Sequence, residues 1–516
     1  MAFLSAANRS FLRAVSHLLY ANPFLPEMVT FERQALRAEM IEEDPLWSAS
    51  VSDPDRVRAN TWLIMKRLSP LVKTLRASLA HGEAANPNDL TLYEDGLLYY
   101  FYYKHYQQLV QATFHSKARD KDRWAFYRDY CDEWKFYFEL SNVTFPSGHQ
   151  ARHTFACYFQ IVRAFHHIFD QIIGNSGPAA RLRASVWQSL FTHDIRRYRR
   201  TLFGRMSEFA TLITGPSGTG KELVARSIAM SRYVPFDENK LAFEEDPPSL
   251  FFPINIAALP GTLVESELFG HKRGSFTGAV QDKRGWLEAC PPLGAVFLDE
   301  IGDLDLAIQV KLLRVIETRS FQAVGEGSAQ LHKFEGKLIA ATNQNLERAI
   351  RKRTFREDLY YRLCSDQIAT PSLRRQMDES PGVLKDLILF MARRVAGSEG
   401  NLLAEEALAW VETNLGADYA WPGNYRELEQ CVRNILIRKD YQPQRVPAAR
   451  AKKDDLFSSA REGTMTANEL LIRYCTLVYG QTGSYEETAR RLEIDRRTVK
   501  AKVDEGELRR LETTAN

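Results

Sequence analysis

A short apolar run beginning at Thr211 leads into a glycine-rich turn and a lysine, in the sequence TLITGPSGTGKE. Glycine at Gly215, Gly218 and Gly220 lets the backbone adopt dihedral angles that turn several amide groups toward one point. These N–H donors, and the positive end of a helix starting near Lys221, suit the oxygens of a phosphate chain. The lysine places a point charge on the outer phosphates. The segment therefore predicts a site for a nucleoside triphosphate.

The residue after this lysine departs from the usual pattern of a phosphate-binding loop. A serine or threonine hydroxyl normally stands there and ligates magnesium, whereas this chain has Glu222. The loop alone therefore leaves nucleotide binding open.

A carboxylate pair farther along the chain supports the same prediction. In GAVFLDEIGDL, Asp299 follows an apolar run and is expected at the carboxyl end of a buried strand, where a carboxylate suits magnesium. Glu300 can orient the attacking water or accept its proton. A third apolar run, LIAATN, brings Thr342 and Asn343 to the same sheet edge, although such a polar residue is often only a strand-end cap. Together these motifs predict a nucleoside triphosphate with Mg²⁺ and hydrolysis of that nucleotide; the family resemblance below implies that the nucleotide is ATP.

The elements around these motifs indicate a multidomain α/β protein. Residues 170–370 alternate strand-like and helical runs, which predicts a parallel sheet covered by helices. Residues 1–165 have apolar residues at helical spacing, and residues 371–440 are again helical. Residues 441–464 read as a linker and residues 465–516 as short helices.

Composition limits the other classes of function. The 516 residues are 45% hydrophobic and 26% charged, and the net charge of +3 gives no general argument for nucleic acid. The six cysteines form no CxxC pair, which favours reduced thiols over a metal or disulfide site. The amino terminus is a poor signal peptide, and no uncharged apolar stretch is long enough to span a membrane. A cytoplasmic protein without a membrane segment is expected.

An aromatic run, LLYYFYYKHY, covers Leu97 to Tyr106 in the first helical region. Such a stripe most often forms a core or a contact between helices. A ligand pocket or a partner surface is the alternative.

Six segments, in this order, resemble the AAA+ ATPase domain of bacterial sigma-54-dependent transcriptional activators: GPSGTGKE, ESELFGHKRGSFTGA, FLDEIGDL, AATNQNL, FREDLYYRL and WPGNYREL. The resemblance covers about residues 170–440. It implies an AAA+ P-loop α/β domain at 170–370, a helical lid at 371–440, and activity in a ring, usually a hexamer. The implied partner is the sigma-54 RNA polymerase.

The resemblance also implies catalytic roles. Asp299 would hold magnesium, Glu300 would activate water, and Asn255 would restrain this glutamate until the ring is ready. Arg356 and Arg362 match the fingers that reach into a neighbouring subunit's site. From the residues alone, the alternative is that these two arginines belong to a salt-bridged face of a helix.

Contacts to ATP are expected near the adenine, around the phosphates and from the lid. The motifs and the resemblance together assign them to Ile173, Gly174, Gly215, Pro216, Ser217, Gly218, Thr219, Gly220, Lys221, Glu222, Asn343 and Arg426.

The segment GSFTGA resembles the loop, usually GAFTGA, with which these activators touch the sigma factor. Phe276 and Thr277 are retained, while Ser275 replaces the usual alanine. An exposed phenylalanine at a glycine-flanked tip is costly unless a partner covers it. The expected sigma-54 contact comprises Gly274, Ser275, Phe276, Thr277, Gly278 and Ala279.

Other departures from the family pattern concern the loop and two insertions. Pro216 stands where the family usually has glutamate, and PFDENKLAFEEDPPSLFF and THDIRRYRRTLFGRMSEF are extra segments. Both insertions could be solvated excursions. The second is basic and could instead touch a neighbouring subunit or nucleic acid.

The end of the chain, GSYEETARRLEIDRRTVKAKV, fits two short helices around a tight turn and resembles a Fis-like helix-turn-helix domain. Acidic residues balance the basic ones, so a solvated charged helix is the alternative. The expected DNA contacts are Arg496, Arg497, Thr498, Lys500 and Lys502.

Residues 1–165 match neither a phosphoacceptor receiver nor a familiar sensor domain, and a helical regulatory domain is expected there. The whole sequence predicts a sigma-54-dependent activator that binds upstream DNA sites, assembles, and hydrolyses ATP to open the promoter complex. A DNA-binding regulator that uses ATP only as an assembly ligand is the alternative. An AAA+ remodeller of another protein is a third reading.

Overall fold

A computed structural model describes residues 3–43, 57–116, 120–244, 250–327, 330–416, 418–443 and 465–504. The chain forms two compact units, Met1–Tyr441 and Gln442–Asn516, which are treated separately below. Most of the predicted linker, residues 444–464, and the last part of the predicted DNA-binding domain, residues 505–516, lie outside the described residues. The predicted domain boundaries stay predictions.

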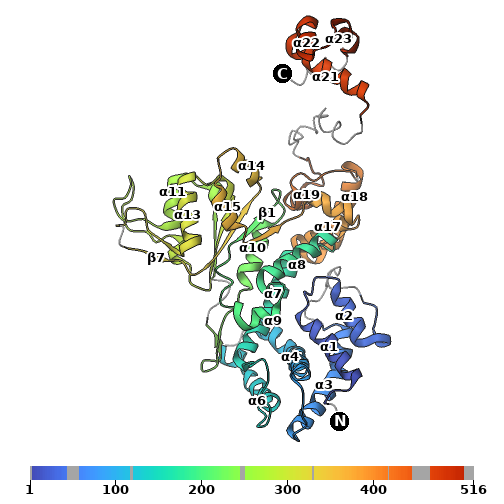
Figure 1. The fold of residues 1–516 in the computed structure, drawn as a ribbon, viewed down its shortest axis with the longest axis vertical. Coiled ribbons are helices and arrows are strands. Elements are labelled where there is room, and N and C mark those ends of the chain that lie inside the picture. Colours follow the sequence, from blue (N-terminus) through green and yellow to red (C-terminus); the bar gives the residue numbers. More distant parts are fainter. Residues whose placement is uncertain are drawn as a thin grey trace. The chain divides into compact units, whose positions relative to one another are not determined.

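The first unit is built around a five-stranded parallel sheet with strand order β4-β5-β8-β1-β9 (Figure 1). The strands are β1 (Thr211–Thr214), β4 (Phe251–Asn255), β5 (Ala295–Asp299), β8 (Lys337–Thr342) and β9 (Asp366–Ala369). The first four coincide with the apolar runs of the sequence. Strand β9 was not predicted, because DQIA is short and its first two residues are polar.

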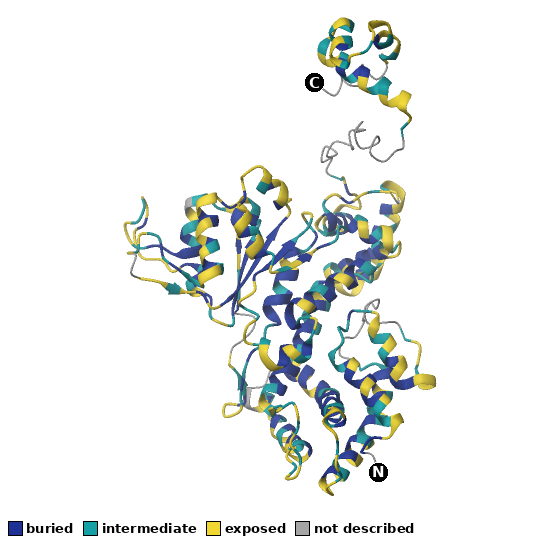
Figure 2. Cartoon of the chain, in the orientation of Figure 1, coloured by how far each residue is buried: buried dark blue, intermediate teal, exposed yellow. Residues whose placement is uncertain are grey.

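Helices cover both faces of the sheet, as the near-continuous apolar strands require. In β8, Ile339 and Ala341 pack into one buried cluster, while Leu338 and Ala340 pack into the other. The first cluster includes helices α7 (Ala151–Gln171), α8 (Gly177–Phe191) and α10 (Lys221–Met230). The second includes α11 (Gly261–Phe269), α13 (Leu306–Thr318) and α15 (Glu357–Leu363). Figure 2 shows buried residues along the central strands of the sheet, and β1, β5 and β8 are the most continuously buried of the five.

A helical lid follows the sheet and has its own core around Trp421. Its helices are α16 (Leu373–Glu379), α17 (Val383–Ala396), α18 (Gly400–Asn414) and α19 (Asn424–Arg438). The predicted helical character of residues 371–440 is confirmed.

The amino-terminal region is helical, as predicted, and packs around an aromatic core. Its longer helices are α1 (Ala6–Tyr20), α2 (Glu27–Leu36), α3 (Ala59–Ala80), α4 (Pro87–Val110) and α6 (Tyr127–Phe138). Most of the aromatic run lies buried in α4, where Phe101 contacts the rings of Tyr130 and Trp134. The core interpretation of this run is therefore confirmed.

The described parts of both insertions pack against this helical region, so the expectation of solvated excursions is wrong for them. Residues 245–249 of the first insertion lie outside the described residues. The second forms α9 (Ile195–Arg197) and a π-helix (Tyr198–Leu202), in which Tyr198 and Arg199 are buried. The first forms the hairpin β2 (Phe236–Asp237) and β3 (Ala242–Phe243), whose phenylalanine rings contact Trp124. Apolar residues within each polar-looking segment supply buried area that offsets the cost of ordering it.

In the second unit, the described residues 465–504 form the helices α21 (Ala467–Thr482), α22 (Tyr485–Leu492) and α23 (Arg496–Lys502). Glu493 has a left-handed backbone at the end of α22, and Asp495 caps α23 by accepting a hydrogen bond from the Arg497 amide. Val499 is fully buried among the helices. The predicted helix-turn-helix pattern and the multidomain α/β class are confirmed. Among the described residues, no helix is both long and apolar enough to cross a membrane.

Candidate functional site

The phosphate-binding loop connects β1 to α10 and is shaped by its glycines. Gly215, Gly218 and Gly220 all have positive φ angles, of 151°, 76° and 87°. A Cβ on Gly215 would lie 2.1 Å from the Thr370 hydroxyl, and one on Gly218 would lie 2.2 Å from the Gly423 carbonyl. Gly220 is the N-cap of α10, so the helix begins directly at the loop.

The Lys221 side chain is largely buried at the first position of this helix. Its Nζ donates to the carbonyls of Gly215 and Pro216, at 3.2 and 3.3 Å. Burial lowers the pKa of Lys221, and the nearby carboxylates of Glu300 and Asp299 act in the opposite sense. The lysine is thus held over the loop with carbonyl partners that a phosphate oxygen could replace.

Asp299 is the last residue of β5, at the carboxyl edge of the sheet, and Glu300 follows it directly. Burial, and then the charge of Glu300, raise the pKa of Asp299. Glu300 has a left-handed backbone, and its Oε2 accepts a hydrogen bond from the Asn343 amide at 3.2 Å. Asn255 lies directly opposite Asp299 in the neighbouring strand β4. The structure therefore brings these four predicted residues to one edge.

A pocket of about 520 Å³ joins the loop, the carboxylates and the lid. Most of the predicted nucleotide and catalytic residues line it: Ile173, Ser217, Gly218, Thr219, Gly220, Lys221, Glu222, Asn255, Asp299, Glu300 and Arg426. Gly215 and Pro216 contribute the carbonyls that hold Lys221. Gly174 and Asn343 do not line the pocket, although each is adjacent in sequence or bonded to a residue that does.

The sequence analysis missed the apolar wall of this pocket. Leu182 comes from α8, Phe390 and Met391 from α17, and Tyr425 from α19. Their spacing in the sequence is that of ordinary core residues, because these side chains approach the phosphate-binding loop only in the folded chain.

The turn between α7 and α8 is fixed by Arg183. This buried side chain donates to the Ile172 carbonyl at 2.8 Å and to the Gly174 carbonyl at 2.5 Å. Gly174 has a φ angle of 103° and faces Gln376 and Leu387 of the lid. The predicted adenine-side residues are thus placed between the sheet and the lid.

The lid also contacts the phosphate loop directly. The Tyr425 amide donates to the Gly218 carbonyl at 3.1 Å, and Asn424 Nδ2 donates to the Ser217 carbonyl at 2.9 Å. Arg426, the next residue of α19, lines the pocket. A nucleotide in the pocket would therefore be enclosed by the loop and the lid together.

The carboxylates of this pocket fit a magnesium ion. Asp299 feels the negative charges of Glu300 and Glu222, and a divalent cation would relieve that repulsion. No group of three potential metal-ligating side chains occurs in the described part of the chain. An ion here would accordingly depend on phosphate oxygens and water for its remaining ligands.

Arg356 and Arg362 are not brought to this pocket. Arg356 forms a bidentate pair with Asp358, at 3.0 and 2.6 Å, and Arg362 pairs with Glu317 at 3.1 Å. All four side chains are well exposed. Within one chain, these arginines form the salt-bridged surface that the residues alone suggest, and they remain accessible to a second chain.

The GSFTGA segment forms a compact tip beyond α11. The Gly274 amide donates to the Ala279 carbonyl at 2.9 Å, and Gly274 and Gly278 both have positive φ. Phe276 is half-buried against the His271 ring, at a centroid distance of 4.9 Å, so the expected bare phenylalanine is wrong. Thr277 is exposed.

The tip is held by a second loop. A Cβ on Gly325 would lie 2.5 Å from the Ser275 Cβ, so a larger residue there would displace the tip. Lys272 pairs with both Asp282 and Glu326, at 3.6 and 3.3 Å. Ser275, the departure from the family pattern, is thus a packing residue of this junction.

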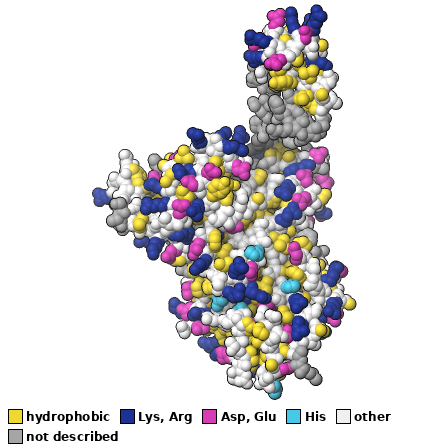
Figure 3. Space-filling model, viewed as in Figure 1, with side chains coloured by type: hydrophobic (Ala, Val, Ile, Leu, Met, Phe, Trp, Pro, Cys, Tyr) yellow, Lys and Arg dark blue, Asp and Glu magenta, His cyan; other side chains and the backbone are white. Residues whose placement is uncertain are grey.

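In the second unit, the predicted DNA contacts lie on or beside α23. Arg497 and Lys500 are exposed, whereas Thr498 is half-buried. Arg496 pairs with Glu486 at 3.1 Å, and the Lys502 ammonium donates to the Asn468 side chain. Among the described residues of this unit, Arg497, Thr498 and Lys500 have no such side-chain partner. On the face drawn in Figure 3, basic and acidic side chains are interspersed.

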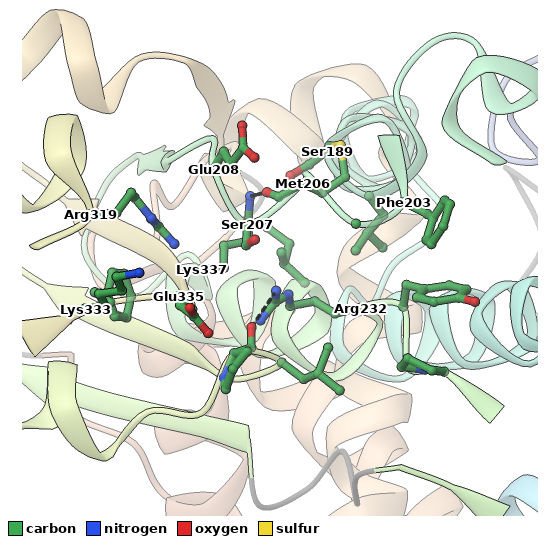
Figure 4. A pocket seen from close by; sticks show the side chains of 18 of the residues that line it. Ser189, Phe203, Met206, Ser207, Glu208, Arg232, Arg319, Lys333, Glu335 and Lys337 are labelled. Atoms are coloured by element: carbon green, nitrogen blue, oxygen red, sulfur yellow. Dashed lines mark hydrogen bonds between the residues drawn. The ribbon is translucent and has the colours of Figure 1, made fainter. Parts of the chain in front are cut away.

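A larger cavity, of about 860 Å³, lies at the opposite, amino edge of the sheet (Figure 4). Arg232, Arg319 and Lys337 come from three different elements and face it. Lys337 donates to the Met206 and Phe209 carbonyls, at 3.3 and 3.0 Å, and burial lowers its pKa to about 8. None of the predicted nucleotide residues lines this cavity.

Comparison with known proteins adds the following similarities. Residues 193–369 match the family model described as the sigma-54 interaction domain. The Nif-specific regulatory protein of Enterobacter agglomerans is 39% identical over 274 residues, which are 53% of this chain and 45% of that protein. The DNA-binding transcriptional regulator NtrC of Salmonella typhimurium is 42% identical over 238 residues, or 46% of either chain.

Among solved structures, NtrX from Brucella abortus in complex with ATP is 24% identical, with a TM-score of 0.39, and the match covers 69% of this chain and 76% of that one. The chain spans somewhat less than half the length of the two curated relatives it matches.

Proposed function

We propose that this chain, whose residues 193–369 form a sigma-54 interaction domain, is a sigma-54-dependent transcriptional activator. Its AAA+ ATPase part hydrolyses ATP with Mg²⁺, and its helix-turn-helix unit binds upstream DNA sites. Subunits assemble into a ring, a hexamer as in the family that the sequence resembles, and act on RNA polymerase in the cytoplasm.

The observation that carries this proposal is the connection between the ATPase carboxylates and the GSFTGA tip. Asn255 ends β4 beside Asp299, and the chain then runs through α11 directly into the tip. Helix α11 is tied to α13 by an ion pair between Glu265 and Lys311. Cleavage of the phosphate bond changes the surroundings of Asp299 and Glu300. The packed helices α11 and α13 therefore connect that change with the exposed Thr277.

The chemistry assigned to the pocket follows from its residues. Lys221 neutralises phosphate charge, Asp299 holds the ion, and Glu300 orients the water that attacks the outer phosphate. The ion supplies charge neutralisation at the phosphates when bound. Arg356 and Arg362 complete a neighbouring subunit's site, so hydrolysis depends on assembly.

A Thr277→Ala variant tests the proposal. Thr277 is exposed and far in sequence from the ATP-binding residues, so ATP hydrolysis should stay within about twofold of the unaltered protein. Open-complex formation at a sigma-54 promoter should be lost, as measured by permanganate footprinting of the melted DNA. A variant that still opens the promoter would assign the chain to the class that uses ATP only for assembly or acts on another partner.

A further inference from the structure

The cavity of about 860 Å³ at the amino edge of the sheet is walled in part by the second insertion, a segment that the family pattern lacks. The remaining walls come from α8, from the chain after α10, from the end of α13 and from the start of β8. Pockets that bind small molecules ordinarily have volumes of about 300–1,000 Å³. The cavity therefore has the size of a ligand site, and it shares no lining residue with the nucleotide pocket.

Three cationic side chains face this cavity from separate elements (Figure 4). Arg232 comes just after α10, Arg319 directly follows α13, and Lys337 begins β8. None of the three forms an ion pair with a carboxylate of the described residues. Their hydrogen-bond acceptors there are main-chain carbonyls: Pro292 and Gly294 for Arg232, Gly336 for Arg319, and Met206 and Phe209 for Lys337.

The charges of these side chains act on one another. Burial lowers the pKa of Lys337 to about 8; the charge of Asp366 opposes this shift, whereas those of Arg232 and Arg319 add to it. Burial also lowers the pKa of Arg232, and the charge of Arg319 acts in the same sense. The fold thus holds three cations close enough to repel one another.

Carboxylates offset this positive charge only in part. Glu208 and Glu335 line the cavity, are exposed, and act on Arg319 through their charge without pairing with it. With Lys333 included, the wall carries four cationic and two anionic side chains. The surplus of positive charge favours an anion that bears more than one negative charge.

We propose that this cavity binds a ligand with at least two phosphate groups. Arginine and lysine have more donors than the carbonyls use, so Arg232, Arg319 and Lys337 each donate a charge-assisted hydrogen bond to a phosphate oxygen. Apolar side chains of the wall, among them Phe203 and Tyr233, leave a surface for an organic part of the ligand. Binding at this site does not depend on the proposed function of the chain.

The cavity and the nucleotide pocket lie at opposite ends of the same elements. Helix α10 begins with Lys221 in the nucleotide pocket and gives Ile228 to the cavity. Strand β8 begins with Lys337 in the cavity and ends with Thr342 at the carboxyl edge of the sheet. The two sites can therefore be altered separately.

Isothermal titration of the full chain with pyrophosphate, in magnesium-free buffer, tests the site. The titration uses the Lys221→Ala variant, whose nucleotide pocket lacks its phosphate-binding lysine. One pyrophosphate should bind per chain. Orthophosphate should bind at least about tenfold more weakly, because it carries less charge and reaches fewer of the three cations.

Substitutions in the cavity locate the bound anion. Added to Lys221→Ala, Arg319→Gln should weaken binding of pyrophosphate at least about tenfold, and Lys337→Met, which keeps the apolar stem, should do the same. Arg314→Gln changes an exposed arginine of α13 that does not line the cavity, and it should leave binding unchanged. Each variant should keep the helical circular dichroism of the unaltered chain, which separates lost binding from lost folding.

The proposal fails if pyrophosphate gives no saturable binding up to about 10 mM, a range that detects even millimolar affinity. Binding no tighter than that of orthophosphate would also overturn it. Binding that is lost in Lys221→Ala, yet unchanged by Arg319→Gln in the otherwise unaltered chain, would place the anion in the nucleotide pocket and overturn it as well.

A second titration of the Lys221→Ala chain distinguishes the sources of the phosphate groups. A nucleoside diphosphate that binds more tightly than pyrophosphate would identify an organic phosphate as the ligand. The reverse order would identify an inorganic phosphate chain.

Discussion

Gly218 is the residue at which the phosphate loop and the lid touch most closely. The Gly218 carbonyl accepts a hydrogen bond from the Tyr425 amide, and its missing Cβ leaves room for the Gly423 carbonyl. Gly220 has a similar positive φ, but the atom nearest its missing Cβ is Leu223 Cδ1, at 3.7 Å. Both glycines thus have a strained φ for any other residue, but only Gly218 also has a close neighbour. Comparing substitutions at the two positions separates the effect of backbone strain from that of steric contact.

Gly218→Ala should weaken ATP binding much more than Gly220→Ala. Both variants accept a left-handed alanine at a cost of roughly 1–2 kcal/mol, while only Gly218→Ala must push the lid away from the loop. We expect at least about a tenfold larger rise in Kd for ATP, measured by titration of each variant. Equal effects would show that the lid contact does not shape the site.

At this scale, the sequence predicted the charged and glycine residues of the site well. Lys221, Asp299 and Glu300 could be identified because their chemistry is local to short motifs. Leu182, Phe390 and Tyr425 could not, because apolar residues acquire a role in the pocket only through tertiary packing. Phe276 was expected bare because its contact with His271 depends on the folded tip.

Among the elements, β8 carries an unusual first residue. Lys337 is 2% exposed at the amino end of the strand, and burial lowers its pKa to about 8. An unfolded lysine has a pKa of about 10.4. Between about pH 8 and pH 10 the unfolded chain therefore binds more protons than the folded chain, and this lysine makes the protein more stable as the pH rises.

Lys337→Met should remove that pH dependence. The stability of the unaltered protein relative to the variant should rise by about 3 kcal/mol from pH 8 to pH 10.5 and stay flat below pH 8. Unfolding temperatures measured across this range test the expectation. Lys333→Met, an exposed lysine of the same cavity, serves as the control. Parallel curves for the unaltered protein and Lys337→Met would contradict it.

Sequence patterns predicted most elements but not how the insertions pack. Strands β1, β4, β5 and β8 are strongly apolar and were found, whereas β9 is too short and polar to be distinguished. The two insertions look hydrophilic because their apolar residues are scattered. Their burial depends on the aromatic core of the helices, which no local pattern reveals.

In the first unit as a whole, side-chain contacts as well as the continuous chain connect the amino-terminal helical region with the part that contains the five-stranded sheet. Arg196 of the second insertion pairs with the buried Asp95 of α4, and α7 packs along α10 below the phosphate loop. A regulatory role for residues 1–165 therefore has a physical route to the nucleotide site. That role stays a prediction.

The exposed arginines give a prediction about the assembly. Arg356→Ala and Glu300→Gln should each lower ATP hydrolysis at least about a hundredfold. Mixing the two variants should restore part of the rate. A Glu300→Gln subunit still has Arg356, which can complete the site of an Arg356→Ala neighbour whose Glu300 is intact. A mixture as inactive as its components would place Arg356 outside the site of the neighbouring subunit.

The central claim is that phosphate cleavage drives promoter opening through the GSFTGA tip. In vitro transcription from a sigma-54 promoter, with purified polymerase and either ATP or a non-hydrolysable analogue, tests it most directly. The account predicts transcripts with ATP and none with the analogue, although both nucleotides support assembly. Equal transcription with the analogue, or protein that assembles on its DNA and leaves ATP intact, would contradict it.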